Sequence, residues 1–124
     1  MRKAKISQLF LLFTGLSCAA EWDDLIDAAI LKTKQMLRDH ADETDIRLCY
    51  LAAAQANLQY RQIVAARASA APTYAGNTAA ARDDSAQCTL AQKLVSEYRL
   101  AAAALLRDDA FVFQTIPESG GASC

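Results

Sequence analysis

Four cysteines are the residues of this chain that can form a covalent cross-link, and they stand at positions 18, 49, 88 and 124. No two of them have the C-x-x-C spacing of a redox pair or of a haem-attachment motif. The chemistry that they predict is a structural disulfide, which forms in an oxidising compartment. Whether the chain is exported therefore decides whether its cysteines are expected to form disulfides.

His40 is the single imidazole, and it stands in the acidic run from Asp39 to Asp45. A metal or proton-transfer role would combine it with its carboxylate neighbours. A polar residue near a helix end is the simpler interpretation, because a partly cationic ring is favourable there. The run also lacks the turn glycine and the alternating ligands of a calcium loop.

Paired aspartates are the remaining candidates for acid–base chemistry, at Asp23/Asp24, Asp83/Asp84 and Asp108/Asp109. All three pairs fall at the ends of expected helices, where capping and solvation explain acidic residues. No motif places a nucleophile beside a base. We therefore predict no enzyme activity, no cofactor and no metal ligand, and a catalytic or ligand-carrying domain is the least favoured interpretation.

Residues 1–20 have the three-part layout of a secretory signal peptide. Arg2, Lys3 and Lys5 form a basic start, residues 9–13 an apolar centre, and residues 18–20 an end of small side chains. Removal of this segment leaves a mature chain of residues 21–124, which we expect to be periplasmic or secreted. The apolar stretch is far shorter than the roughly 20 residues that cross a bilayer, so we expect no transmembrane span.

An alternative interpretation makes Cys18 the lipid-modified first residue of a lipoprotein, with a membrane anchor. The residues before it, Gly15, Leu16 and Ser17, place the leucine one position too close to the cysteine for that motif. We therefore favour cleavage before Glu21 without a lipid.

Net charge narrows the choice of partner. The whole chain carries a formal charge of −1, and loss of three cations with the leader makes the mature chain more acidic. An acidic chain is a poor ligand for nucleic acid or anionic lipid, so neither is expected as a partner.

Composition and periodicity predict a single all-α domain, a small bundle of three main helices with a packed C-terminal tail. The chain has 27 alanines but only four glycines and two prolines, which favours helix over sheet. Apolar residues at steps of three and four indicate helices over roughly 23–40, over about 25 residues before Ala71 and Pro72, and over 84–109. Two apolar faces on the second of these predict a central helix that is contacted from both sides.

Two segments are expected to be irregular. Residues 72–86 combine proline, glycine, asparagine and small side chains without periodicity, which indicates a long loop. Asp84 and Gln87 have the spacing of a capping box that opens the third helix. In the tail, residues 111–116 are apolar and are expected to pack on the bundle, while residues 117–124 are expected to be flexible.

The disulfide pairing depends on the direction of the helices. If the long loop crosses the bundle so that the second and third helices run parallel, Cys49 pairs with Cys88. A repeated pattern around these two cysteines, each followed by leucine two residues later and tyrosine 10 or 11 residues later, favours that arrangement. In an up-and-down bundle they lie too far apart, and Cys49 would pair with Cys124 instead.

The functional prediction is protein binding. Tyr74 is an aromatic residue on an expected loop, and with Arg82, Asp83 and Asp84 it forms the predicted contact surface. We expect an exported helical protein that binds another envelope or periplasmic protein, as an accessory to a process such as secretion or conjugative transfer. The alternative is an immunity or inhibitor protein that blocks a partner enzyme with its 72–86 loop.

Overall fold

A computed structural model describes residues 1–69 and 75–107, with the side chains of residues 1–68 and 84–107. This part of the chain contains four α-helices: α1 (Lys3–Thr14), α2 (Asp23–Gln35), α3 (Ile46–Ser69) and α4 (Ala75–Ala101). Short 3-10 turns at Ala20–Trp22 and Ala103–Leu105 precede α2 and follow α4. Within these ranges there is no β-strand, so the predicted all-α bundle is confirmed.

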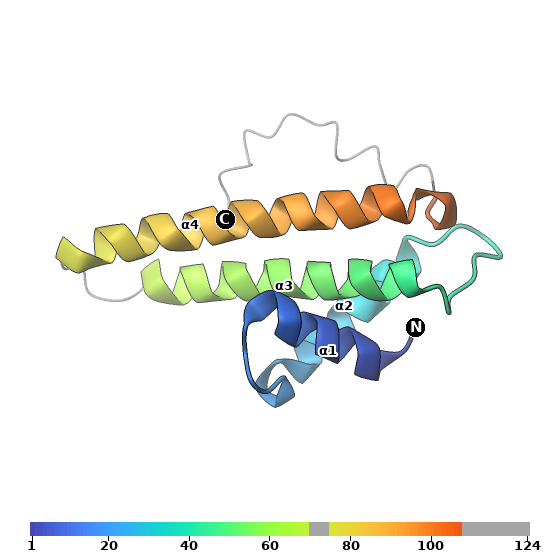
Figure 1. The fold of residues 1–124 in the computed structure, drawn as a ribbon, viewed down its shortest axis with the longest axis horizontal. Coiled ribbons are helices and arrows are strands. Elements are labelled where there is room, and N and C mark those ends of the chain that lie inside the picture. The colour runs from blue at the N-terminus through green and yellow to red at the C-terminus, as the bar shows by residue number, and fades with distance from the viewer. Residues whose placement is uncertain (70–74, 108–124) are drawn as a thin grey trace.

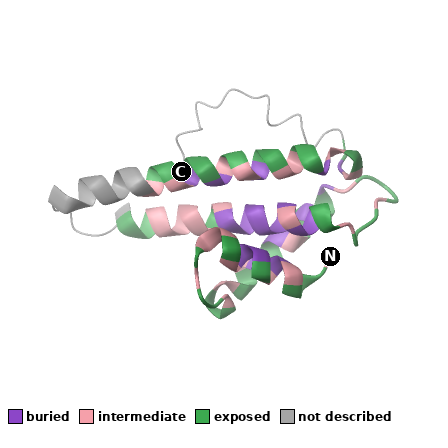
Figure 2. Ribbon diagram, viewed as in Figure 1, coloured by how far each residue is buried: buried purple, intermediate pink, exposed green. Residues whose placement is uncertain are grey.

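α3 is the central helix of the bundle, as its two apolar faces predict. It lies against α4 on one side and against α1 and α2 on the other (Figure 1). One face of α3 buries Cys49, Ala52, Ala53 and Ala56 toward α1 and α2. The adjacent face buries Leu48, Leu51 and Ala54 toward α4. The buried residues therefore concentrate in the first half of α3 (Figure 2).

α3 and α4 form an antiparallel hairpin (Figure 1). The rings of Tyr50 and Tyr98 meet with their centroids 5.3 Å apart, and Arg47 donates from Nη1 to the carbonyl of Ala101 at 3.3 Å. The start of α3 thus lies beside the end of α4, which is the up-and-down arrangement.

The prediction of a long loop over residues 72–86 is wrong, because α4 begins at Ala75. Alanine, the strongest helix former, occupies five of the twelve positions from 75 to 86. Gly76 and Asn77 fall in the first turn, where weak helix formers cost little. Asp84 and Gln87 therefore lie inside a helix and form no capping box at its start. The helix also ends earlier than expected, at Ala101 rather than near residue 109.

The preferred Cys49–Cys88 disulfide is not present. Both residues are buried thiols. Because Tyr98 lies opposite Tyr50 in the hairpin, Cys88 lies opposite a point about 11 residues, or roughly 16 Å, along α3 from Cys49. A disulfide requires Cα atoms within about 7 Å, so the antiparallel arrangement excludes this pair. Cys124 lies outside the described residues, and its pairing with Cys49 stays a prediction.

The ends of α2 and α4 are joined by backbone hydrogen bonds. Arg38 donates from its backbone N–H to Leu105 at 3.0 Å, and Arg107 donates to Met36 at 2.9 Å. These bonds flank an isolated antiparallel bridge between Leu37 and Leu106, and α2 ends at Gln35 and not near residue 40. They also hold Leu106 in the core, where it is fully buried.

Asp45 caps the start of α3. Its carboxylate accepts a hydrogen bond from the backbone N–H of Arg47 at 2.9 Å and two from the Arg47 guanidinium at 3.0 and 2.8 Å. Asp42 and Thr44 form the preceding turn, in which Asp42 accepts hydrogen bonds from the backbone N–H and the hydroxyl of Thr44.

We expect stability to depend on pH through this cap. The hydrogen bonds from the Arg47 guanidinium, and then from its backbone N–H, lower the pKa of Asp45 from 3.8 to about 2. A lowered pKa in the folded state means that the stabilisation is complete above pH 3.8 and is lost as the pH falls toward 2. The difference in melting temperature between the wild type and Asp45→Asn should therefore shrink between pH 5 and pH 2. Glu43→Gln, which removes a charge from the same loop but leaves the cap, is the control. An unchanged difference across this range would contradict the cap.

None of the helices within the described ranges is long and apolar enough to cross a membrane.

Candidate binding surface

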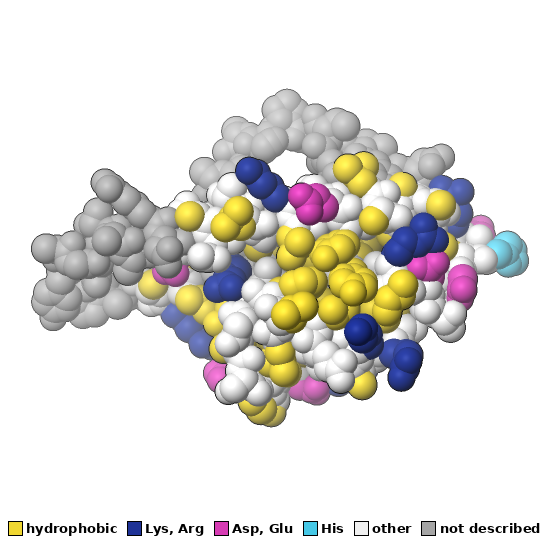
Figure 3. Space-filling model, viewed as in Figure 1, with side chains coloured by type: hydrophobic (Ala, Val, Ile, Leu, Met, Phe, Trp, Pro, Cys, Tyr) yellow, Lys and Arg dark blue, Asp and Glu magenta, His cyan; other side chains and the backbone are white. Residues whose placement is uncertain are grey.

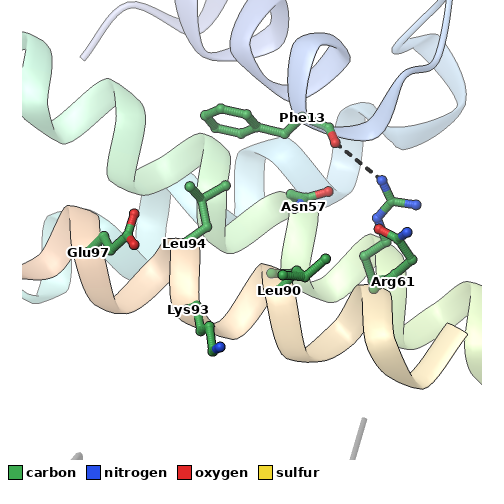
Figure 4. Close-up of a pocket in the computed structure, with 9 residues that line it drawn as sticks. Phe13, Asn57, Arg61, Leu90, Lys93, Leu94 and Glu97 are labelled. Carbon is green, nitrogen blue, oxygen red and sulfur yellow. Dashed lines mark hydrogen bonds between the residues drawn. The ribbon is translucent and has the colours of Figure 1, made fainter. Parts of the chain in front are cut away.

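A groove with a volume of about 350 Å³ lies between α1 and α4, with α3 as its floor (Figure 4). α1 contributes Phe13 and α3 contributes Asn57 and Arg61. The wall from α4 is the longest and consists of Gln87, Leu90, Ala91, Lys93, Leu94 and Glu97. Its size falls in the range of ligand and peptide sites, about 300 to 1,000 Å³.

Asn57 places an unsatisfied hydrogen-bond acceptor in this groove. Its side chain is only 4% exposed, and its Oδ1 has no hydrogen-bond partner. Leaving a buried polar atom unpaired costs about 1 to 3 kcal/mol. Because Oδ1 is itself covered, a donor group from outside the chain can pair with it only when a neighbouring side chain of the groove moves away.

Apart from Asn57, the groove is lined by the apolar side chains of Phe13, Leu90, Ala91 and Leu94 and by the polar side chains of Arg61, Gln87, Lys93 and Glu97. Leu90 and Leu94 point from α4 toward Asn57 and Phe13, while Lys93 points away (Figure 4). Leu90 is 57% exposed despite its apolar side chain. In the space-filling view, apolar side chains gather at the centre of this face of the molecule, with charged groups around them (Figure 3). An apolar centre with a polar rim is the usual anatomy of a protein interface.

α1 covers the part of α3 next to the groove. Ile6, Leu9 and Phe10 of α1 are buried in one core cluster with residues of α2 and α3. The Phe10 ring meets Tyr60 of α3 edge-on, with centroids 5.9 Å apart. In the full-length chain, the apolar centre of the predicted leader is thus a helix of the core.

Both ends of α1 are held by charged groups. At its start, the Lys3 ammonium bridges Asp23 at 3.0 Å and Asp27 at 2.8 Å, and these hydrogen bonds raise the pKa of Lys3. At its end, Arg61 donates to the carbonyls of Phe13 at 3.2 Å and Thr14 at 3.4 Å. These carbonyls belong to the last turn of α1, where carbonyl groups have no hydrogen-bond partner within the helix.

The exposed acidic cluster Asp23, Asp24 and Asp27 is explained by this contact. Its carboxylate oxygens lie within 4.8 Å of one another. Because Lys3 already binds two of the three carboxylates, we assign no metal to them. His40 lies elsewhere: it is exposed and has a left-handed backbone with φ of 63°.

A second cavity of about 220 Å³ lies between α2, α3 and α4. Gln55 in its wall is as buried as Asn57 but is satisfied. It accepts at 3.2 Å from the Thr33 hydroxyl, whose single proton is shared with the Ala29 carbonyl at 2.8 Å, and it donates to the sulfur of Met36 at 3.4 Å. Of these two buried amides on α3, Gln55 thus has hydrogen-bond partners, whereas the Oδ1 of Asn57 has none.

Of the four predicted contact residues, only Asp84 has a side chain within the described part of the chain. Tyr74 and the side chains of Arg82 and Asp83 lie outside the described residues. Asp84 lies within α4 and does not line either cavity. The sequence analysis did not single out the groove residues Asn57 and Leu90. The sequence signal at Asn57 is a polar residue on an apolar face of α3, and the signal at Leu90 is a leucine on α4.

Comparison of the chain with models of protein families, with curated proteins and with solved structures finds no match. The surface is therefore interpreted from its own geometry.

Proposed function

We propose that this chain is exported and binds another protein through the groove face, as an accessory to an envelope process such as secretion or conjugative transfer. The observation that carries the binding role is Asn57 Oδ1, which has no partner in the full-length chain and lies beside Leu90 and Leu94 on the face that stays after processing removes Phe13 with the rest of α1. A partner that supplies an N–H or O–H donor there satisfies the acceptor and covers Leu90 and Leu94.

Support for export comes from the leader and from its processing position. Residues 1–20 carry the basic, apolar and small-residue regions of a signal peptide. Ala20 and Glu21, on either side of the expected cleavage, are exposed. The bond thus lies at the surface of the folded full-length chain, at the start of the 3-10 turn Ala20–Trp22.

The inhibitor alternative loses its main support. It requires residues 72–86 to form a loop that enters an enzyme cleft, and residues 75–86 belong to α4 instead. We therefore carry only the accessory role forward.

Two measurements test the proposal. Mass analysis of the chain from the envelope fraction should find Glu21 as its first residue. For binding, a photo-crosslinking amino acid at Leu90 should capture one defined partner, whereas the same group at Leu31 should not. The pair is matched, since Leu90 is 57% and Leu31 58% exposed and only Leu90 lines the groove. An intact leader on cytosolic protein would refute export, and equal crosslinking at both positions would refute the groove.

A further inference from the structure

The structure places a helix on the face that processing would uncover. This inference rests on the proposed export: we propose that an amphipathic helix of the partner takes the place of α1 once α1 is removed. It binds the surface of α2 and α3 that α1 covers, which we call the seat. The seat consists of Asp23 and Asp27, the small residues Ala52, Ala53 and Ala56, and Tyr60 and Arg61.

The apolar part of the seat defines the spacing of the occupant. Ile6, Leu9 and Phe10 follow the i, i+3, i+4 spacing of a helix that binds in a groove, and each is at most 4% exposed. Beneath them, α3 presents alanines, so a helix can approach its backbone closely. Removal of α1 exposes these alanines together with the buried Ile26 and Ala29 of α2.

The charges of the seat define the direction of the occupant. Lys3 stands in the first turn of α1, where the helix dipole disfavours a cation. It is compensated by Asp23 and Asp27. After processing, these carboxylates lose that cation, and Arg61 loses the carbonyls of Phe13 and Thr14. A partner helix with a basic residue in its first turn and its carboxyl end at Arg61 restores both contacts.

The groove lies beside the seat on the same helix. Asn57 stands one turn before Arg61 on α3, so a helix on the seat runs along the edge of the groove. Side chains of the bound partner then reach Asn57 Oδ1, Leu90 and Leu94. The seat and the groove thus form one binding face when α1 leaves.

The test uses the full-length chain in vitro and a fluorescent peptide of residues 3–14 as the probe. In the wild type, α1 competes for its own seat. Phe10→Ala weakens that competition, and an apparent affinity rises in proportion to the open fraction, so we expect at least about tenfold tighter peptide binding. Leu12→Ala, on the exposed side of α1, should bind the peptide like the wild type. A peptide carrying Phe10→Asp should not bind any of the three chains.

Two results would overturn the proposal. One is equal peptide affinity for all three chains while circular dichroism shows Phe10→Ala to be helical. The other is a doubled mass of Phe10→Ala in solution, because exchanged α1 helices would assign the seat to a second copy. If Phe10→Ala does not fold, Ile6→Val, a smaller truncation of the same face, takes its place with the same expected direction. Failure of export would instead appear as an uncleaved leader in cells and would leave these affinities unchanged.

Discussion

Replacing Phe10 with alanine should lower the free energy of unfolding of the full-length chain by about 3 to 5 kcal/mol. Phe10 is completely buried between α1 and α3, and its ring contacts that of Tyr60. The substitution removes a large apolar side chain and leaves a cavity, and both effects destabilise the folded state. Urea unfolding followed by circular dichroism measures the change.

Leu12→Ala is the matched control, since Leu12 lies two residues along the same helix and is 73% exposed. A surface substitution of this kind changes stability by about 0.5 kcal/mol or less. If both variants unfold like the wild type, α1 is not part of the core and the seat described for it does not exist.

Residues 1–20 show why a single segment can support two interpretations. An apolar run behind a basic start suits a signal peptide, and the same run, as a short amphipathic helix, suits a core. Periodicity alone does not distinguish them, since Ile6, Leu9 and Phe10 satisfy both patterns. The choice depends on whether a complementary surface exists elsewhere in the chain, and that is a property of the folded α2 and α3.

The helices predicted best are those whose apolar spacing is strong. Residues such as Ile26, Ala29 and Thr33 recur on one face of α2 and are buried as expected. The two faces of α3 predicted its central place. Pro72, Gly76 and Asn77 predict an irregular segment, but the alanines that follow favour helix and α4 begins at Ala75. With α4 beginning at Ala75, the hairpin becomes antiparallel and the predicted disulfide is lost.

The groove was beyond sequence reasoning for a different reason. Asn57 stands on an apolar face of α3, but whether its Oδ1 has a partner depends on the relative positions of α1, α3 and α4. Gln55 is two residues away and is paired. Local sequence offers no signal that separates these two amides.

This contrast gives the second large prediction. Asn57→Leu should raise the free energy of unfolding by about 1 to 3 kcal/mol, because it removes a buried acceptor without a partner and leaves an apolar side chain of similar size. Gln55→Met, of similar shape, should instead lower it by about 0.5 to 1.5 kcal/mol per lost hydrogen bond. Urea unfolding of both variants measures the opposite signs.

The same two variants, Asn57→Leu and Gln55→Met, separate an effect on stability from an effect on binding. If Asn57 Oδ1 receives a donor from the partner, Asn57→Leu should reduce photo-crosslinking from position 90 even though the chain is more stable. Gln55→Met lies outside the groove and should leave the crosslink unchanged. A stabilised Asn57→Leu variant that still crosslinks fully would show that the acceptor has no role in recognition. Loss of stability in Asn57→Leu would contradict the prediction that removal of the unpaired Oδ1 is favourable.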